Sequence, residues 1–191
     1  ELAVSDGITI DTDVPVIYSV SEGTFAEDID FQNSDSTLII TWSGDDDASG
    51  ISNYEYALGT TSGGTDAIDW TSTGMSTADT LTGLSLTEGS TYYLSTRATD
   101  VAGNVSDIVT GDGILIDLTA PTAGTVIDGT ESDLSYTGSD STLTGSWSGF
   151  EDNVSGITGY EIAVNGGDVY SWAGVGNVSS TTVTGLSLEH G

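Results

Sequence analysis

Basic residues are almost missing from this chain. Arg97 is the single lysine or arginine among 191 residues, against 30 acidic residues, and the formal net charge is −29. Nucleic acids and anionic membranes attract proteins through Lys and Arg, so this charge excludes both as partners. Cysteine is absent too, which excludes disulfides and thiolate metal sites. No apolar run approaches the ~18 residues of a membrane span, so membrane insertion is not expected.

Histidine is nearly missing as well, since His190 is the only one. With no other histidine and no cysteine, the rest of the chain cannot assemble a Ser-His-Asp or Cys-His set. Because acidic residues are so abundant, some carboxylates are expected to lie in pairs by chance. Strand alternation places Glu55 on the solvent side between two inward tyrosines, and Glu161 is its equivalent. The sequence therefore predicts that the protein is not an enzyme.

One stretch of sequence occurs twice. Residues 5–15 (SDGITIDTDVP) return as residues 111–121 (GDGILIDLTAP), 106 positions later, and TGLSL at 82–86 returns at 184–188, 102 positions later. Insertions and deletions in loops change the distance between equivalent positions in this way. A period near 106 is too long for a solenoid unit and suits a self-contained domain repeated in tandem.

The repeat frame divides the chain into three predicted parts. Residues 1–11 match the terminal strand of a preceding repeat, residues 12–117 form a complete module, and residues 118–191 form a second repeat truncated before its last two strands. The chain is therefore interpreted as an excerpt of a longer array, and neighbouring repeats of the same chain are expected partners.

The secondary structure is predicted to be all-β. Apolar and polar residues alternate with period two in stretches rich in Thr, Ile, Tyr and Trp, and Gly, Ser, Asn and Asp clusters interrupt them. No stretch carries the apolar stripe of an amphipathic helix. In the first module, strands are expected near 14–20, 37–42, 51–58, 66–71, 78–86, 91–99 and 108–116. Seven short antiparallel strands in about 105 residues suggest a two-sheet sandwich.

The alternation also predicts which side chains face the core. In the first module the inward positions are Leu38, Ile40, Trp42, Ile51, Tyr54, Tyr56, Leu58, Tyr92, Leu94, Thr96 and Ala98. The second copy offers Leu143, Trp147, Ile157, Tyr160, Ile162 and Val164.

Several of these residues resemble a known pattern. Trp42, Tyr54 and the stretch LSLTEGSTYYLSTRA are similar to the fibronectin type III family, and Leu86 and Tyr92 have the spacing of its tyrosine corner. More narrowly, DLTAP, VIDG and RATD-AGN-S resemble repeats of large secreted bacterial surface proteins and adhesins of the Bacteroidetes type. The resemblance implies tandem Ig-like or fibronectin type III-like seven-strand sandwiches, secreted and located outside the cell or at its surface. It also implies that Tyr92 bonds back to the preceding turn.

In such a sandwich, two loops and the incoming linker meet at the N-terminal pole. The carboxylates expected there are Asp11, Asp13, Asp45, Asp46, Asp47 and Asp100. Oxygen ligands from three segments suit Ca2+, which accepts six to eight of them in loose geometry. At the second junction, between the first and second repeats, the carboxylates expected to meet are Asp117, Glu151 and Asp152.

A bound Ca2+ would fix the angle between modules and stiffen the array. The alternative is that these acidic residues only form turns, and no EF-hand spacing decides between the two.

Two classes of function remain. The first is a structural or adhesive repeat in a stalk, filament or adhesin, with other subunits of a fibre as further partners. The second is a spacer or carbohydrate-binding accessory module of a secreted multidomain hydrolase, with surface glycans as partners. Sugar stacking would fall to Trp70 and Trp172, because Trp42 and Trp147 are assigned to cores. Regular repetition without a distinctive loop in either copy favours the first class.

Overall fold

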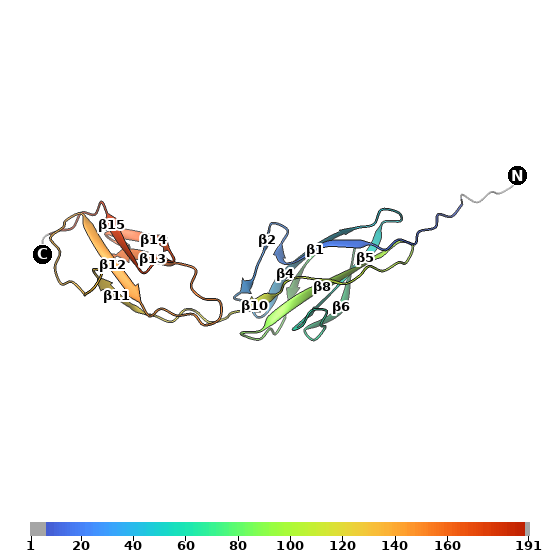
Figure 1. Cartoon of the computed structure of the whole chain (residues 1–191), viewed down its shortest axis with the longest axis horizontal. Helices are drawn as coiled ribbons and strands as arrows, with labels where there is room; N and C mark the ends of the chain where they lie inside the picture. The colour runs from blue at the N-terminus through green and yellow to red at the C-terminus, as the bar shows by residue number, and fades with distance from the viewer. Residues whose placement is uncertain (1–6, 190–191) are drawn as a thin grey trace. The chain divides into compact units, whose positions relative to one another are not determined.

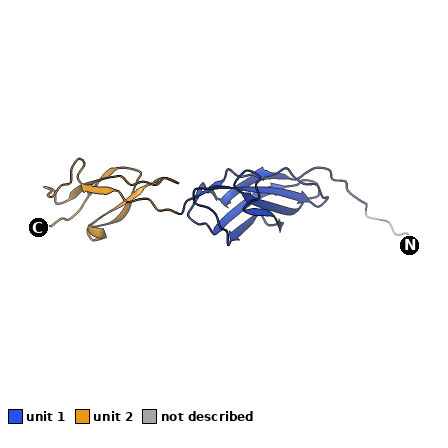
Figure 2. Ribbon diagram, turned by 90° about the horizontal axis from the view of Figure 1, so that it is seen from below, with its two compact units in different colours: residues 1–118 blue, residues 119–191 orange. Residues whose placement is uncertain are grey.

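The computed structural model describes residues 7–189 (Figure 1). The chain divides into two compact units, Glu1–Leu118 and Thr119–Gly191 (Figure 2). The prediction of an all-β chain is confirmed, because the single helical element in the described part is a short 3-10 turn, η1 (Asn165–Gly167). In residues 7–189, no helix is long and apolar enough to cross a membrane.

Unit 1 is built from two sheets. The strands of the first sheet are β1 (Val16–Thr24), β2 (Glu27–Asp28), β4 (Thr37–Asp45) and β7 (Ala78–Thr82), in the order β2-β1-β4-β7. The strands of the second are β3 (Phe31–Gln32), β5 (Ile51–Gly59), β6 (Ile68–Gly74), β8 (Thr91–Asp100), β9 (Val109–Thr110) and β10 (Ile114–Ile116). Their order is β3-β10-β8-β5-β6, and β9 also pairs with β8. All pairings are antiparallel except that of β10 with β3.

Each of the seven strand regions expected in unit 1 forms, with two differences. The last region divides into β9 and β10, separated by residues 111–113. Gly113 there has a φ of +96°, which a residue with a side chain rarely adopts. The strands β2 and β3 were not predicted, because two residues are too few for an alternating pattern.

The core of unit 1 lies between its two sheets. Trp42 is fully buried, with ring centroids 6.3 Å from Tyr54 and 5.8 Å from Tyr56. Around these rings gather Leu38, Ile40, Leu58, Leu81, Leu86, Tyr92, Leu94, Ala98, Ile114 and Ile116. The inward face predicted from alternation is therefore correct for β4, β5 and β8.

The tyrosine corner implied by the family resemblance is present. The backbone N–H of Thr87 donates a hydrogen bond of 3.1 Å to the hydroxyl of Tyr92. We expect Tyr92→Phe to keep the ring packed and to lower the free energy of unfolding by about 0.5–1.5 kcal/mol, the usual contribution of one such bond. Urea denaturation measures it. A loss far above this range would show that the substitution also disturbs ring packing.

Unit 2 repeats part of this arrangement. One sheet contains β11 (Thr125–Asp128), β12 (Thr142–Ser148) and β15 (Ser180–Thr184), and a two-stranded sheet contains β13 (Tyr160–Val164) and β14 (Tyr170–Gly176). Trp147 is buried, with its ring centroid 5.4 Å from Tyr160. Phe150 meets the same tyrosine edge-on at 5.7 Å.

The other inward positions predicted for unit 2 are less covered than their counterparts. Ile157, Ile162 and Val164 are only partly buried. In unit 1, β5 lies between β6 and β8, whereas β13 pairs with β14 alone among the described residues. Without a strand in the position of β8, these side chains lack the contacts that bury β5.

The predicted strand at residues 1–11 does not appear in its described part. Residues 7–15 form no strand, and residues 1–6 lie outside the described residues. Ile8 and Ile10 are 92% and 83% exposed. Their sequence equivalents Ile114 and Ile116 are buried in β10, where β8 and β3 supply pairing partners that residues 7–11 lack.

Candidate cation-binding pole of the first unit

Three acidic residues from three segments meet at the end of unit 1 where β1 begins. Asp11 lies in the segment before β1, Asp46 in the loop between β4 and β5, and Asp100 at the end of β8. One carboxylate oxygen of each lies within 4.8 Å of the other two. We call this group the pole cluster.

Asp46 closes the β4–β5 loop. Its Oδ2 accepts hydrogen bonds from the backbone N–H groups of Ser49, at 3.0 Å, and Gly50, at 2.7 Å. Its Oδ1 is shielded from solvent and accepts no hydrogen bond from any described residue. A carboxylate oxygen without water or a donor is an unfavourable arrangement, so this atom is the position at which a cation would contribute most.

Asp100 closes the next loop. It is 2% exposed, and its Oδ1 accepts from the backbone N–H groups of Gly103, at 2.6 Å, and Asn104, at 2.8 Å. Its Oδ2 accepts from the side-chain amide of Asn104 at 2.7 Å. Desolvation raises the pKa of the Asp100 carboxyl, but these hydrogen bonds together outweigh it and hold the pKa below its ordinary value of 3.8. The carboxylate is therefore the favoured form, as a metal ligand requires.

Asp11 ties the incoming segment to both loops. Its Oδ2 accepts from the backbone N–H of Ser49 at 3.0 Å, and its backbone carbonyl accepts from the side chain of Asn104 at 3.3 Å. Ser49 and Asn104 were not predicted as site residues. Their signal in the sequence is the DDDASG and DVAGN turns, which carry donors close after the acids.

The structure does not bring the other predicted pole residues into the pole cluster. Asp45 and Asp47 are exposed, and Asp45 accepts the backbone N–H of Asp46 at 2.9 Å. Consecutive residues point in different directions, so only one of the three reaches the cluster. Asp13 is exposed, and its backbone N–H donates to Asp11 at 3.0 Å, which turns the chain between the two residues.

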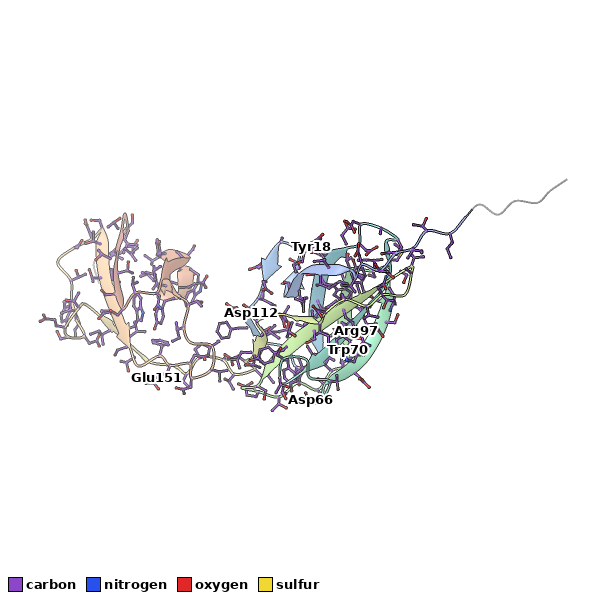
Figure 3. The ribbon with its side chains drawn as sticks, turned by 45° about the vertical axis from the view of Figure 1, so that its right-hand side comes forward. Tyr18, Asp66, Trp70, Arg97, Asp112 and Glu151 are labelled. Carbon is purple, nitrogen blue, oxygen red and sulfur yellow. The ribbon has the colours of Figure 1, made fainter. Side chains whose placement is uncertain are left out.

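The residues predicted for the second junction belong to different units. Asp117 is buried in unit 1. In unit 2, Asp152 repeats the role of Asp46, because its Oδ1 accepts from the backbone N–H groups of Val154, Ser155 and Gly156 at 3.0–3.1 Å. Glu151, labelled in Figure 3, is exposed. A cation at this junction stays a prediction.

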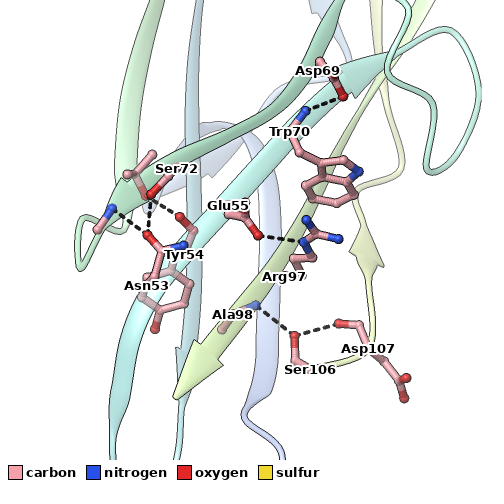
Figure 4. A network of polar contacts seen from close by, with 12 residues as sticks. Asn53, Tyr54, Glu55, Asp69, Trp70, Ser72, Arg97, Ala98, Ser106 and Asp107 are labelled. Atoms are coloured by element: carbon pink, nitrogen blue, oxygen red, sulfur yellow. Dashed lines mark hydrogen bonds and ion pairs between the residues drawn. The ribbon is translucent and has the colours of Figure 1, made fainter. Parts of the chain in front are cut away.

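The chain's only arginine lies on one of the two candidate sugar-binding rings (Figure 4). Arg97 Nε donates to Glu55 at 2.8 Å, and its guanidinium lies 4.3 Å from the centroid of the Trp70 ring. Glu55 thus pairs with a cation on the neighbouring strand, a structural use of this carboxylate. Because the guanidinium covers one face of Trp70, this ring offers less surface to a sugar. Trp172 is 66% exposed.

A second acidic group, which the sequence did not suggest, contains Glu22, Asp28 and Asp112. The overlooked indication is the position of Glu22 two residues after inward-facing Val20 in β1, which places both side chains on the same side of the strand.

Comparison with known proteins finds similarity among solved structures alone. No family model and no curated protein matches the chain. Among solved structures, the crystal structure of chicken CNTN1 FN1-FN3 domains is similar, with a TM-score of 0.32 and 15% identity over 90% of this chain. The matched part is 54% of that structure, so the chain spans about half of its length.

Proposed function

We propose that this chain is a structural or adhesive repeat segment, without catalytic activity, of a long extracellular or cell-surface bacterial protein such as a stalk, filament or adhesin. The observation that carries the proposal is the recurrence of one packing motif. Trp42 and Tyr54 of unit 1 and Trp147 and Tyr160 of unit 2 are equivalent ring pairs, with centroids 6.3 Å and 5.4 Å apart. Recurrence of the core rather than of a distinctive surface is typical of an array that provides length.

The use of the carboxylates supports the same role. Asp46, Asp100 and Asp152 each accept two or three backbone N–H bonds that close a short loop. These bonds stabilise turns and leave the loops compact. Catalytic carboxylates are instead recognised by pairs of titratable groups whose environments push their pKa values apart.

The coding region around this segment tests the proposal. Further copies at a period near 106 residues, without a catalytic domain, are the expected finding for a stalk or filament. A hydrolase domain beside a small number of copies would contradict it and favour the spacer.

The proposal includes a Ca2+ ion at the pole cluster. Three carboxylates lie close together without a basic side chain, and Asp46 Oδ1 has no donor within the described part of the chain. Ca2+ prefers oxygen ligands and tolerates irregular geometry. Binding would tie the segment before β1 to the loops after β4 and β8, and would stiffen the entry to unit 1.

Calorimetric titration with Ca2+ tests this site. We expect saturable binding and, at a free Ca2+ concentration a hundredfold above Kd, a stabilisation of about 2.7 kcal/mol that a chelator removes. Asp46→Asn should weaken binding at the pole. Asp47→Asn is the matched control, because it removes the same charge from the adjacent exposed residue. Equal effects of the two substitutions would contradict the assignment.

The alternative is a spacer or carbohydrate-binding accessory module. The observation that supports this alternative is the exposure of Trp172, which is 66% exposed. Trp172 lines an aromatic pocket in unit 2 together with Trp147, Phe150 and Tyr160. Exposed aromatic rings can stack on sugars. Glycan binding that is lost in Trp172→Ala and kept in Trp70→Ala would favour this function.

A further inference from the structure

Glu22 is a charged residue placed inside the sandwich of unit 1. It follows Val20 on the inward side of β1 and is 0% exposed. Its Oε1 accepts a hydrogen bond of 2.8 Å from the backbone N–H of Leu94, in β8 of the opposite sheet. Its Oε2 has no hydrogen-bond partner among residues 7–189 and no contact with solvent. One half of a buried carboxylate is therefore unsatisfied, which is costly unless a proton or a cation compensates.

Two further carboxylates face the same point. Asp28 comes from β2, and Asp112, labelled in Figure 3, comes from the break between β9 and β10. One oxygen of each lies within 4.8 Å of the other and of a Glu22 oxygen. Asp28 is held in place, because its Oδ1 accepts from the hydroxyl of Ser21 at 2.8 Å. Asp28 and Asp112 are exposed, so water can reach their side of the group.

Gly111 lets the carboxylate of Glu22 pack directly against the backbone. A Cβ built on this glycine would lie 2.4 Å from Glu22 Oε2 and 2.8 Å from Oε1, closer than real Cβ contacts allow. The backbone of Gly111 is fixed at this place, since its N–H donates to the carbonyl of Leu94 at 2.9 Å. The absence of a side chain at Gly111 therefore lets the Glu22 carboxylate fit against this backbone.

No lysine or arginine is free to neutralise this group. The only Lys or Arg is Arg97, and it pairs with Glu55. Burial is the largest cause that raises the pKa of Glu22, and the charges of Asp28 and Asp112 add to it, whereas the hydrogen bond from Leu94 lowers it. Three carboxylates without a positive partner have two ways to coexist, by taking up a proton or by binding a cation.

We propose that Glu22, Asp28 and Asp112 bind one Ca2+ ion that joins β1 and β2 to the segment between β9 and β10. The buried Glu22 oxygen supplies the ligand that lacks any other partner, and the two exposed aspartates supply the others. Water completes the six to eight oxygens that Ca2+ accepts. This site is separate from the pole cluster, and binding at it does not depend on the proposed function.

The mechanical consequence does rest on the proposed function. β1 is the first strand of unit 1 and β10 the last, so tension on the chain acts on these two strands first. A cation held by residues on both sides would resist their separation.

Nuclear magnetic resonance on the full chain tests the binding. Titration with Ca2+ should produce saturable shifts at the amides of Leu94 and Gly111, which flank Glu22. In Asp112→Asn the apparent affinity at these amides should fall at least tenfold, whereas Asp47→Asn, the matched loss of one exposed charge elsewhere, should leave it unchanged. Absent shifts, or equal affinity in Asp112→Asn, would overturn the site.

The variant Glu22→Gln distinguishes a bound cation from a bound proton at this group. With Ca2+ a hundredfold above Kd, the melting temperature of unit 1 in the Asp46→Asn background should exceed that in chelator by roughly 10 °C. Adding Glu22→Gln should abolish the difference while unit 1 stays folded. If Ca2+ and chelator give the same melting temperature before this change, Glu22 is a buried neutral acid and the proposal fails. Loss of this site would leave the proposed function intact, since that depends on the neighbouring coding sequence.

Discussion

Trp42→Ala is expected to remove most of the stability of unit 1. Trp42 is fully buried and contacts the rings of Tyr54 and Tyr56, so truncation leaves a large cavity between the two sheets. Such a change costs about 3–5 kcal/mol, because packing contacts and apolar burial are lost together. Domains of this size are stable by only about 5–15 kcal/mol, so a large part of the population is expected to unfold at moderate temperature.

Hydrogen exchange at amides of β8 in the full chain measures this effect for unit 1 alone. Trp172→Ala is the matched control, since it deletes the same side chain at a position that is 66% exposed. We expect protection at Leu94 to collapse in the first variant and to stay unchanged in the second. Similar protection in both would show that the packing around Trp42 contributes little to stability.

Strands with one strongly apolar face could be predicted from the sequence. β4 presents Leu38, Ile40 and Trp42 at alternate positions, and all three are nearly or fully buried. Period two carries this information because one face of the strand meets the other sheet. The corner of Tyr92 was also predicted, because its spacing from Leu86 resembles the family pattern.

The missed strands depend on contacts that no local pattern encodes. β3 is two residues long and pairs with β10, more than 80 positions away in the sequence. Glu22 was missed for a related reason. A glutamate in a strand is expected to face solvent, and only the close approach of Gly111 and Leu94 shows how it is accommodated inside.

The pole cluster was predicted in part. The family resemblance implied that the segment before β1 and two loops meet, and Asp11, Asp46 and Asp100 do so. It could not select among Asp45, Asp46 and Asp47, because the direction of each side chain in a turn depends on local backbone angles. Asp46 accepts the N–H groups of Ser49 and Gly50, three and four residues on, and turns inward, whereas Asp45 accepts only from its neighbour and stays exposed.

Asp100→Asn is expected to produce the largest change at the pole. The asparagine Oδ1 can still accept from Gly103 and Asn104, but its amide would face the side-chain amide of Asn104, so a donor meets a donor. As a proposed ligand of Ca2+, Asp100 also contributes charge. Ca2+ affinity at the pole should therefore fall by at least the roughly 10–100-fold that loss of an outer-shell partner costs.

The pH dependence of the same variant tests the hydrogen bonds without any metal. The pKa of Asp100 is lower in the folded chain than its ordinary value of 3.8, so folding favours the carboxylate. Its contribution to stability is complete above that value and is lost as pH falls through the lower folded pKa. Wild type and Asp100→Asn should therefore differ in free energy of unfolding near neutral pH and converge in acid.

Urea denaturation with a chelator present, followed at amides of unit 1 from about pH 6 to about pH 2, measures this convergence. Asp47→Asn serves as the control, because Asp47 is exposed and lies outside the pole cluster. A constant difference between wild type and Asp100→Asn across this range would mean that the carboxylate gains nothing from the loop. The loop at residues 101–104 would then be held by its backbone alone, and the pole cluster would not be preorganised for a cation.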